Sequence, residues 1–370
     1  MKIPLSKTYV NQKELKGITQ VLKSGWLTEG PKNKEFEQRF AEYIGSRYAI
    51  SLNSCTSALF LVLKALNISG EVILPSFTFV ASANAVITAG AKPVFADIDY
   101  QTGNIDPKDV EKKITKKTQA IMPVHFAGQA CTMDKIMALA KKYKLWVIED
   151  SAEAIGAKFK NKKTGSFGIG CFSFFPTKNI TTGEGGMVTT NDSRLAQKIR
   201  TLAGHGISKT THQRIKTKKP WYRAAITAGY NFRMSNILAT LGVEQLKKLD
   251  RMNNLRRKNA IYLNECLKQV PNIIIPMEAK NCYHVYQMYT FKLKKGDRDD
   301  LVKKLKEKNI EASVHFDPPV HLQPAYKDFK DIKLPNTEKL SKYIVTLPMF
   351  PGLKKIELDY IINNLKAILG

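Results

Sequence analysis

The sequence has few cysteines, no long apolar run and a shortage of acidic residues. The cysteines number five and no two of them have C-x-x-C spacing; they are Cys55, Cys131, Cys171, Cys266 and Cys282. This usage argues against a disulfide framework and a zinc site, so we expect no bound metal. No segment has the apolar length of a membrane-spanning helix, and the opening MKIPLSKTYVNQKELKG lacks a signal-peptide core. We therefore expect a soluble, cytoplasmic protein with no membrane partner.

The shortage of acids leaves the chain strongly basic. Lys and Arg number 59 against 32 Asp and Glu, which gives a formal net charge of +27 and a pI of about 9.7. Such a charge raises the possibility of nucleic-acid binding. In residues 246–258 and 292–309, however, the lysines and arginines are mixed with acids at helical spacing, which favours solvated helix faces. We therefore expect no nucleic-acid partner. A basic surface would also attract a nucleotide diphosphate.

An apolar run at residues 145–148 is followed by two acids. The run is partly β-branched and predicts a buried strand that ends in Glu149 and Asp150. In open α/β sheets ligands bind at the carboxyl edge, so Asp150 would meet a cofactor there. The alternative is that Asp150 only caps the next helix.

A second run at residues 171–175 predicts another strand, which contains Ser173 and leads to Lys178 in a Thr- and Gly-rich loop. A lysine is usually a solvated surface charge, but a partly desolvated one can attack a carbonyl. The combination favours a catalytic role for Lys178, because an acid, an amine and hydroxyls are what a pyridoxal phosphate enzyme needs. Asp150 would hold the pyridinium nitrogen, Lys178 would form the Schiff base, and hydroxyls such as that of Ser173 would bind the phosphate.

Residues 48–66 predict a strand, a turn of small residues and an apolar helix. Thr56 and Ser57 stand where free N–H groups and the helix dipole would favour an anion, so both are candidates for the cofactor phosphate. An ordinary Ser/Thr helix cap explains them equally well.

The remaining pattern predicts an α/β fold in two domains. Strand-like runs at residues 72–74 and 93–96 flank a helix of small residues, and such β-α-β alternation predicts parallel strands. His125 ends a further strand, and we interpret it as structural. Helices are predicted at residues 14–25, 34–45 and 194–202, and one very long helix follows residue 235.

Residues 212–230 have no clear period and predict a long loop that could reach a neighbouring subunit. From residue 275 onward the pattern becomes α+β, with strands at 283–293 and 310–316 and helices at 298–309 and 356–369. We therefore expect a large domain at residues 1–250, and a long helix with a small domain at residues 251–370.

The segments EDSAEAIGA (149–157) and FSFFPTKNITTGEGGMVTTND (172–192) closely resemble the DegT-type sugar aminotransferases, which are pyridoxal phosphate enzymes acting on nucleotide-linked keto sugars. The resemblance extends from SGWLTEGP (24–31) to LPMFPGL (347–353). It implies fold type I, like aspartate aminotransferase: a large domain with a mainly parallel, seven-stranded type of sheet, and a small α+β C-terminal domain.

The resemblance also implies roles for residues outside the central stretch. Phe79 would stack on the pyridine ring, whereas without the resemblance a core Phe would be favoured at this position. Asn231 would reach the cofactor phosphate of a partner chain in a homodimer with shared active sites, although alone it fits a turn. Glu153 stands where many relatives contact the ring hydroxyl with Gln or His. Most relatives carry Gly-Thr at positions 55 and 56. This sequence has Cys55 in place of the Gly and keeps Thr56.

Four further residues are expected near the substrate by the same resemblance. Trp26 and Thr28 belong to a turn that lies close to the active site in the family, although on general grounds packing roles are the better interpretation. His315 and His321 lie where the family brings residues toward the substrate.

The implied reaction is transamination from glutamate to C3 or C4 of a nucleotide-linked keto sugar, for a cell-surface or secreted glycan. Lys178 would carry the cofactor and act as general acid/base. Two alternatives remain: a dehydratase of the same fold, in which that lysine is replaced, and a basic regulator with a vestigial site. The motifs identify neither the sugar nor its nucleotide.

Overall fold

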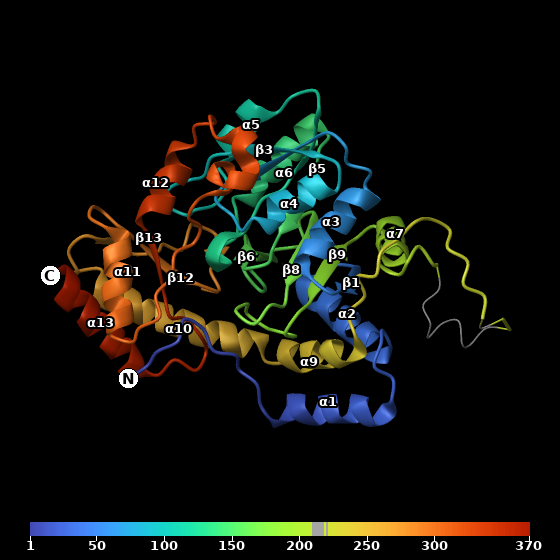
Figure 1. The fold of residues 1–370 in the computed structure, drawn as a ribbon, viewed down its shortest axis with the longest axis horizontal. Helices are drawn as coiled ribbons and strands as arrows, with labels where there is room; N and C mark the ends of the chain where they lie inside the picture. The colour runs from blue at the N-terminus through green and yellow to red at the C-terminus, as the bar shows by residue number, and fades with distance from the viewer. Residues whose placement is uncertain (209–217, 220) are drawn as a thin grey trace.

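A seven-stranded sheet forms the centre of the computed structural model, which describes residues 1–208, 218–219 and 221–370 (Figure 1). In spatial order the strands are β1 (Tyr48–Leu52), β9 (Gly186–Thr190), β8 (Ile169–Ser173), β5 (Trp146–Asp150), β4 (Thr118–Ile121), β2 (Glu71–Pro75) and β3 (Lys92–Ala96). Only β9 runs antiparallel to its neighbours in this sheet. The mainly parallel sheet confirms the predicted α/β fold class.

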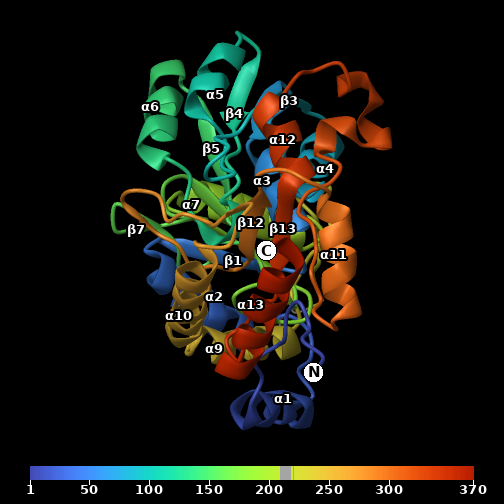
Figure 2. The same cartoon turned by 90° about the vertical axis from the view of Figure 1, so that its left-hand side faces the viewer.

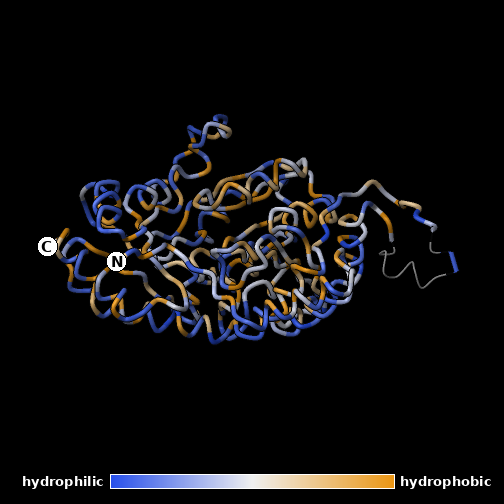
Figure 3. Tube along the Cα trace, turned by 60° about the horizontal axis from the view of Figure 1, so that its bottom comes forward, coloured by the Kyte–Doolittle hydropathy of each residue, from blue (hydrophilic) through white to orange (hydrophobic). Residues whose placement is uncertain are grey.

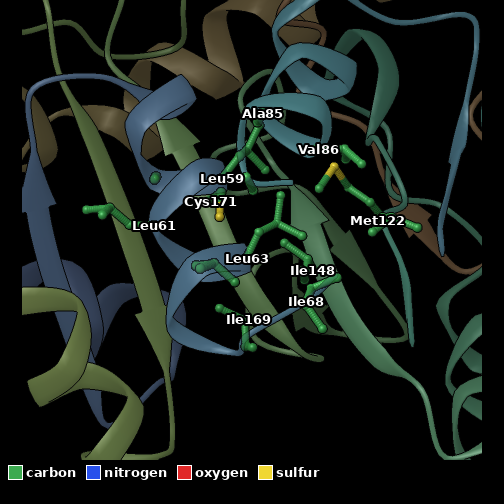
Figure 4. Packing of buried hydrophobic residues seen from close by; sticks show 14 of the residues in the cluster. Leu59, Leu61, Leu63, Ile68, Ala85, Val86, Met122, Ile148, Ile169 and Cys171 are labelled. Atoms are coloured by element: carbon green, nitrogen blue, oxygen red, sulfur yellow. The ribbon is translucent and has the colours of Figure 1, made fainter. Parts of the chain in front are cut away.

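Helices cover both faces of this sheet. On one face α3 (Cys55–Ala65) packs against β8 and β9 and is flanked by α4 (Ala81–Thr88) and α7 (Ser193–Ala203). Figure 4 shows Leu59, Leu63 and Ile148 between α3 and the sheet. The other face is covered by α5 (Pro107–Lys113), α6 (Met133–Tyr143) and α2 (Pro31–Ile44). Strands buried on both faces explain the continuous apolar runs in the sequence.

The predicted very long helix is wrong, because the chain forms two helices, α9 (Asn236–Leu246) and α10 (Leu249–Leu267). Lys248 leaves the helical conformation and points its amine at the Tyr9 carbonyl and Glu14. Tyr9 precedes α1 (Gln12–Ser24) and Glu14 lies in its first turn, and this helix packs on α9. The break is made by these long-range contacts, and no Gly or Pro marks it in the sequence.

The C-terminal part builds its own sheet and core. Strands β10 (Ile273–Ile274), β12 (Tyr289–Leu293) and β13 (Ile344–Leu347) pair, and α11 (Arg298–Glu307), α12 (Pro335–Tyr343) and α13 (Lys355–Leu369) surround them. Its core includes Ile3 from the N-terminus, which pairs with Ile310, and both termini lie at this end (Figures 1 and 2). The domain division at residue 250 stays a prediction.

Two predicted C-terminal strands differ from the structure. The run 283–293 contributes only β12 and the end of β11 (Cys282–Tyr283), which joins β6 (Lys158–Phe159) and β7 (Lys162–Lys163) in a separate sheet. In 310–316 Ser313 bridges to Thr346, and the chain then turns so that His315 and Phe316 face a cavity. Short 3-10 turns complete the fold: η1 (Phe126–Gly128), η2 (Val320–Leu322) and η3 (Pro324–Phe329).

The outer helices alternate between hydrophilic and hydrophobic residues, as amphipathic helices do on the surface of an α/β fold (Figure 3). Across the described ranges, no helix combines the length and the apolar character that crossing a membrane requires.

Candidate active site

A cavity of about 460 Å³ opens at the carboxyl ends of β1, β5 and β8. Its walls come from the central sheet and from the C-terminal part of the chain. Seven of the residues predicted from the sequence line it: Thr56, Phe79, Asp150, Glu153, Ser173, Lys178 and His315. The fold therefore brings together side chains that are up to 259 positions apart in the chain, from Thr56 to His315 (315 minus 56).

Asp150 is the last residue of β5 and is buried. Its carboxylate accepts hydrogen bonds from the Ser82 hydroxyl at 2.7 Å and from the Ala152 N–H at 3.1 Å. Burial raises the pKa of Asp150, whereas the bonds from Ser82 and Ala152 lower it. Residues 151–157 form turns and no helix, so Asp150 is not a helix cap.

Lys178 follows β8 in a loop that hydrogen bonds hold at Thr177 and Lys178. Its own N–H donates to the Phe175 carbonyl at 2.9 Å, and Gln287 donates to the carbonyl of Thr177 at 2.8 Å. The lysine side chain is only 17% exposed, and its amine lies 3.4 Å from a Glu153 carboxylate oxygen. Lys178 is therefore a partly buried amine at the cavity wall and not a solvated surface charge.

Glu153 is held in place from the opposite side. Its second carboxylate oxygen accepts the Ala127 N–H at 3.0 Å, and Ala127 adopts a left-handed backbone conformation with φ 54° in η1. The carboxylate is buried and bridges this turn to Lys178. Glu153 thus orients the amine in this structure.

The first turn of α3 forms one end of the cavity. Ser54 caps this helix by accepting the Ser57 N–H at 3.0 Å, and Ser54, Cys55 and Thr56 all line the cavity. Ser57 lies behind them, with its hydroxyl 2.9 Å from that of Ser54. The helix N-terminus, with its free N–H groups and the Thr56 hydroxyl, suits a phosphate.

Phe79 and His315 lie on other walls. Phe79 is 63% exposed and borders the cavity, so it is not a core residue. His315 contacts the Thr346 hydroxyl at 2.8 Å, and burial lowers its pKa, an effect that Lys178 strengthens and Glu153 opposes. The His315 imidazole is therefore neutral near pH 7.

Besides Ser57, four predicted residues are not among the described residues that line the cavity. His321 is fully buried, with its Nδ1 2.6 Å from the Ser76 hydroxyl. Trp26 and Thr28 lie in the turn between α1 and α2, where the Trp26 indole donates to the Glu29 carbonyl. Asn231 is exposed and pairs with Gly204. Part of the predicted loop at 212–230 lies outside the described residues.

The structure adds residues that sequence reasoning missed. Ser82 supports Asp150, and Gln287 lines the cavity with a buried carbonyl oxygen that has no donor in the described part of the chain. Ser82 stands in a helix of small residues and Gln287 in an apolar stretch, so neither carried a local signal. His125 lies outside the cavity wall and contacts Glu149 at 3.0 Å, both fully buried.

The described residues fit pyridoxal phosphate. They provide a buried acid, an amine at the wall, an exposed aromatic ring and a helix N-terminus, all around one cavity. A Cβ on Gly186 would lie 2.3 Å from the backbone of Ser54, so only glycine allows β9 to approach the first turn of α3. The donor set matches the groups that the cofactor requires.

Comparisons with known proteins agree with this site. The model of the DegT/DnrJ/EryC1/StrS aminotransferase family matches residues 8–366. The chain is 40% identical over 378 residues to the Bacillus subtilis spore coat polysaccharide biosynthesis protein SpsC, covering 99% of this chain and 97% of that protein.

Solved structures have the same fold. Helicobacter pylori PseC, an aminotransferase involved in the biosynthesis of pseudoaminic acid, superposes with a TM-score of 0.94 at 28% identity, covering 100% and 99% of the two chains. The PLP-form of the sugar aminotransferase Spr1654 from Streptococcus pneumoniae gives 0.92 at 28% identity, covering 100% and 98%. The chain therefore belongs to the DegT/DnrJ/EryC1/StrS aminotransferase family and, as a sugar aminotransferase of that family, depends on pyridoxal phosphate.

Proposed function

We propose that the chain transfers the amino group of glutamate to C3 or C4 of a nucleotide-linked keto sugar, of the 4-keto-6-deoxy or a related type. The product would be an amino sugar for a cell-surface or secreted glycan, such as lipopolysaccharide O-antigen. The observation that carries the proposal is the Lys178 amine, held 3.4 Å from Glu153 in the same cavity as buried Asp150.

Bound pyridoxal phosphate supplies an electron sink for the carbon next to the transferred nitrogen. Lys178 would hold the cofactor and then move a proton at that carbon as general acid/base. Asp150 would bind the ring nitrogen and keep it protonated. Ser82 and the Ala152 N–H support this role because they stabilise the Asp150 carboxylate against the effect of burial.

The phosphate would bind at the first turn of α3, through Thr56 and the backbone that Ser57 and its cap hold in place. Ser173, at the end of β8, lines the cavity and offers a further hydroxyl. Phe79 offers an exposed ring face for stacking. Glu153 would keep the Lys178 amine aimed into the cavity.

The apolar side of the cavity supports a deoxy sugar. Leu5, Met288, Phe316, Leu347 and Met349 line it, and none of these side chains donates a hydrogen bond or offers more than a weak acceptor to a hydroxyl group. A methyl group at C6 would be buried here without leaving a polar group unpaired, whereas a C6 hydroxyl would lose its hydrogen bonds to water.

The site would be completed by a second copy of the chain in a homodimer. Asn231 is exposed and not among the described cavity-lining residues of its own chain, which suits a role in the partner's site. Trp221, Tyr222 and Ile226 nearby are 66–71% exposed, an amount of apolar surface that a partner would cover.

The dehydratase and regulator alternatives are less well supported, because Lys178 is present and oriented by Glu153. The test is a half-reaction: protein loaded with pyridoxal phosphate is mixed with glutamate alone. We expect one 2-oxoglutarate per active site and loss of the cofactor's visible absorbance band. A panel of nucleotide keto sugars should then restore that band, and the sugar that restores it fastest is the substrate. Absence of 2-oxoglutarate would refute the proposal.

A further inference from the structure

Two segments that are far apart in the chain form parts of the cavity wall and meet behind it. The first, residues 76–82, follows β2 of the central sheet and brings Phe79 to the cavity. The second, residues 313–322, belongs to the C-terminal part of the chain and brings His315 and Phe316 to the cavity. The shape of the cavity therefore depends on how these two segments are joined.

The two segments are joined at Ser76 by three hydrogen bonds. The Val320 N–H donates to the Ser76 carbonyl at 3.0 Å, and the His321 N–H donates to the Ser76 hydroxyl at 3.0 Å. The same hydroxyl lies 2.6 Å from Nδ1 of the His321 ring. All three residues are fully buried. A hydrogen bond lost here is not replaced by one to bulk water, so its loss leaves a buried polar group unpaired.

The hydrogen-bond pattern sets the tautomer of His321. The Ser76 hydroxyl accepts the His321 N–H, and within the described part of the chain its own proton has no acceptor other than Nδ1. The ring proton therefore lies on Nε2, which is 3.7 Å from a Glu338 carboxylate oxygen. Burial lowers the pKa of His321, and the charge of Glu338 opposes this effect. The ring is thus neutral near pH 7 and able to accept the bond from Ser76.

The second segment is also fixed to the C-terminal part of the chain. The Ser341 hydroxyl of α12 donates to the Phe316 carbonyl at 2.8 Å, and Arg298 of α11 donates to the Asp317 carboxylate at 2.6 Å. The segment thus runs from α11 and α12 to the end of β2. Its contact with Ser76 determines where it meets the central sheet.

A displacement at Ser76 would reach Phe79, because only two residues separate them. One of the two, Phe77, is fully buried and packs its ring against that of Phe316, with centroids 5.6 Å apart. Close-packed interiors of this kind transmit a displacement instead of absorbing it. The position of the exposed Phe79 ring is therefore linked to the contact between Ser76 and His321.

We propose that His321 is a positioning residue for the cofactor, which acts through Ser76 to hold the Phe79 ring where it can stack on the pyridine ring. The inference rests on the stacking role that the proposed function gives to Phe79. It replaces the expectation that His321 lies near the substrate, because His321 is not among the described residues that line the cavity.

The test measures the dissociation constant of pyridoxal phosphate by titrating the cofactor-free protein. His321→Leu should weaken binding about tenfold, and Ser76→Ala, a smaller change that removes the same contact, should do so by a similar factor. His321→Asn should bind normally, because its amide oxygen can take the place of Nδ1. Tyr326→Phe is the matched control. It removes a hydrogen bond of 2.6 Å to Asn84 from the turn that follows, away from the described cavity wall, and should keep the wild-type affinity.

A double-mutant cycle with Phe79→Ala separates this inference from the proposed function. If His321 acts through Phe79, His321→Leu should weaken binding less than about twofold once Phe79 is alanine. An unchanged dissociation constant in Phe79→Ala would refute the stacking role, and this inference with it. If Phe79→Ala does weaken binding, three results would overturn the inference alone: normal binding in His321→Leu and Ser76→Ala, losses that multiply in the double variant, or an equal loss in Tyr326→Phe.

Discussion

Asp150 is buried at the edge of the sheet, but its carboxylate still accepts hydrogen bonds from neighbouring donors. Burial raises the pKa of this carboxyl group, and the Ser82 hydroxyl and the Ala152 N–H lower it. Glu153 raises it and Lys178 lowers it through their charges. Ser82 is therefore a positioning residue whose hydroxyl helps decide whether Asp150 is ionised at the pH of the reaction.

Ser82→Ala should raise the pKa of Asp150 further, because the ionised carboxylate loses a donor. In the glutamate half-reaction, the acid limb of the rate–pH profile should move upward by about one pH unit. Ser82→Thr keeps the hydroxyl and should leave the profile in place. A Ser82→Ala profile that superposes on the wild-type one would show that Asp150 does not depend on Ser82.

The buried His284 allows us to predict how the stability of the fold changes in acid. Burial lowers its pKa to about 3, while the same group in the unfolded chain titrates near 6.5. Between these two pKa values the unfolded state binds more protons than the folded state. The stability that neutral His284 contributes is therefore fully present above pH 6.5 and is lost as the pH falls.

Between pH 6.5 and pH 4 this histidine should cost about 3 kcal/mol of unfolding free energy. His284→Asn should lose less over that range, as measured by urea unfolding at both pH values. His205→Asn, at an exposed position, should lose as much as the wild type. Identical losses for all three proteins would exclude His284 as the cause.

At the scale of elements, the site depends on how β9 approaches the start of α3. Gly186 opens β9 and pairs with Leu52 of β1, and a Cβ at Gly186 would lie 2.3 Å from the Ser54 backbone. The same first turn holds Thr56 at the cavity. Packing at this point therefore links stability to phosphate binding.

Gly186→Ala should lose about 3 kcal/mol of stability and most of the cofactor affinity, because α3 must shift. Urea unfolding and a cofactor titration measure the two effects. Gly352→Ala is the control, since a Cβ there meets nothing within 4 Å. Equal stability of the two variants would contradict the close approach of β9 and α3.

Local patterns predicted the central elements well and the C-terminal ones less well. The strand at 48–52 and the ends of β2, β3 and β5 follow from apolar runs, because strands buried on both faces need apolar residues at every position. The break at Lys248 and the missing strand at 310–316 depend on partners far away in the chain, Tyr9 and Thr346. The hydrophobic periodicity of one segment contains no information about such long-range contacts.

The same distinction applies to the site. Asp150 and Lys178 were found because a strand end and a loop lysine are local features, and the family resemblance gave Phe79 and Asn231. Gln287 became visible only through burial, since its side-chain oxygen has no partner in the described residues.

At the scale of the whole molecule, the cavity lies between the central sheet and the C-terminal part, and a second chain would complete it. Lys292 of β12 joins these parts by donating to the carbonyls of Tyr100 and Gln101 at 3.0 Å each. The exposed Asn231 and the apolar residues near it mark the face that we expect to meet a partner.

Complementation tests the shared site. Lys178→Ala and Asn231→Ala should each be impaired alone, and mixing them should recover about a quarter of wild-type activity, since half the dimers are mixed and each has one intact site. Size measurements should show a dimer throughout. A mixture that stays as impaired as its components would contradict the role of Asn231 across the interface.

We expect Lys178 to be the amine that carries the cofactor. The direct measurement is borohydride reduction of the pyridoxal-phosphate-loaded protein, followed by peptide mass spectrometry. We predict a single phosphopyridoxyl modification, on Lys178, which disappears if glutamate is added before the reduction. A modification spread over surface lysines, or one on Lys178 that glutamate does not remove, would contradict it.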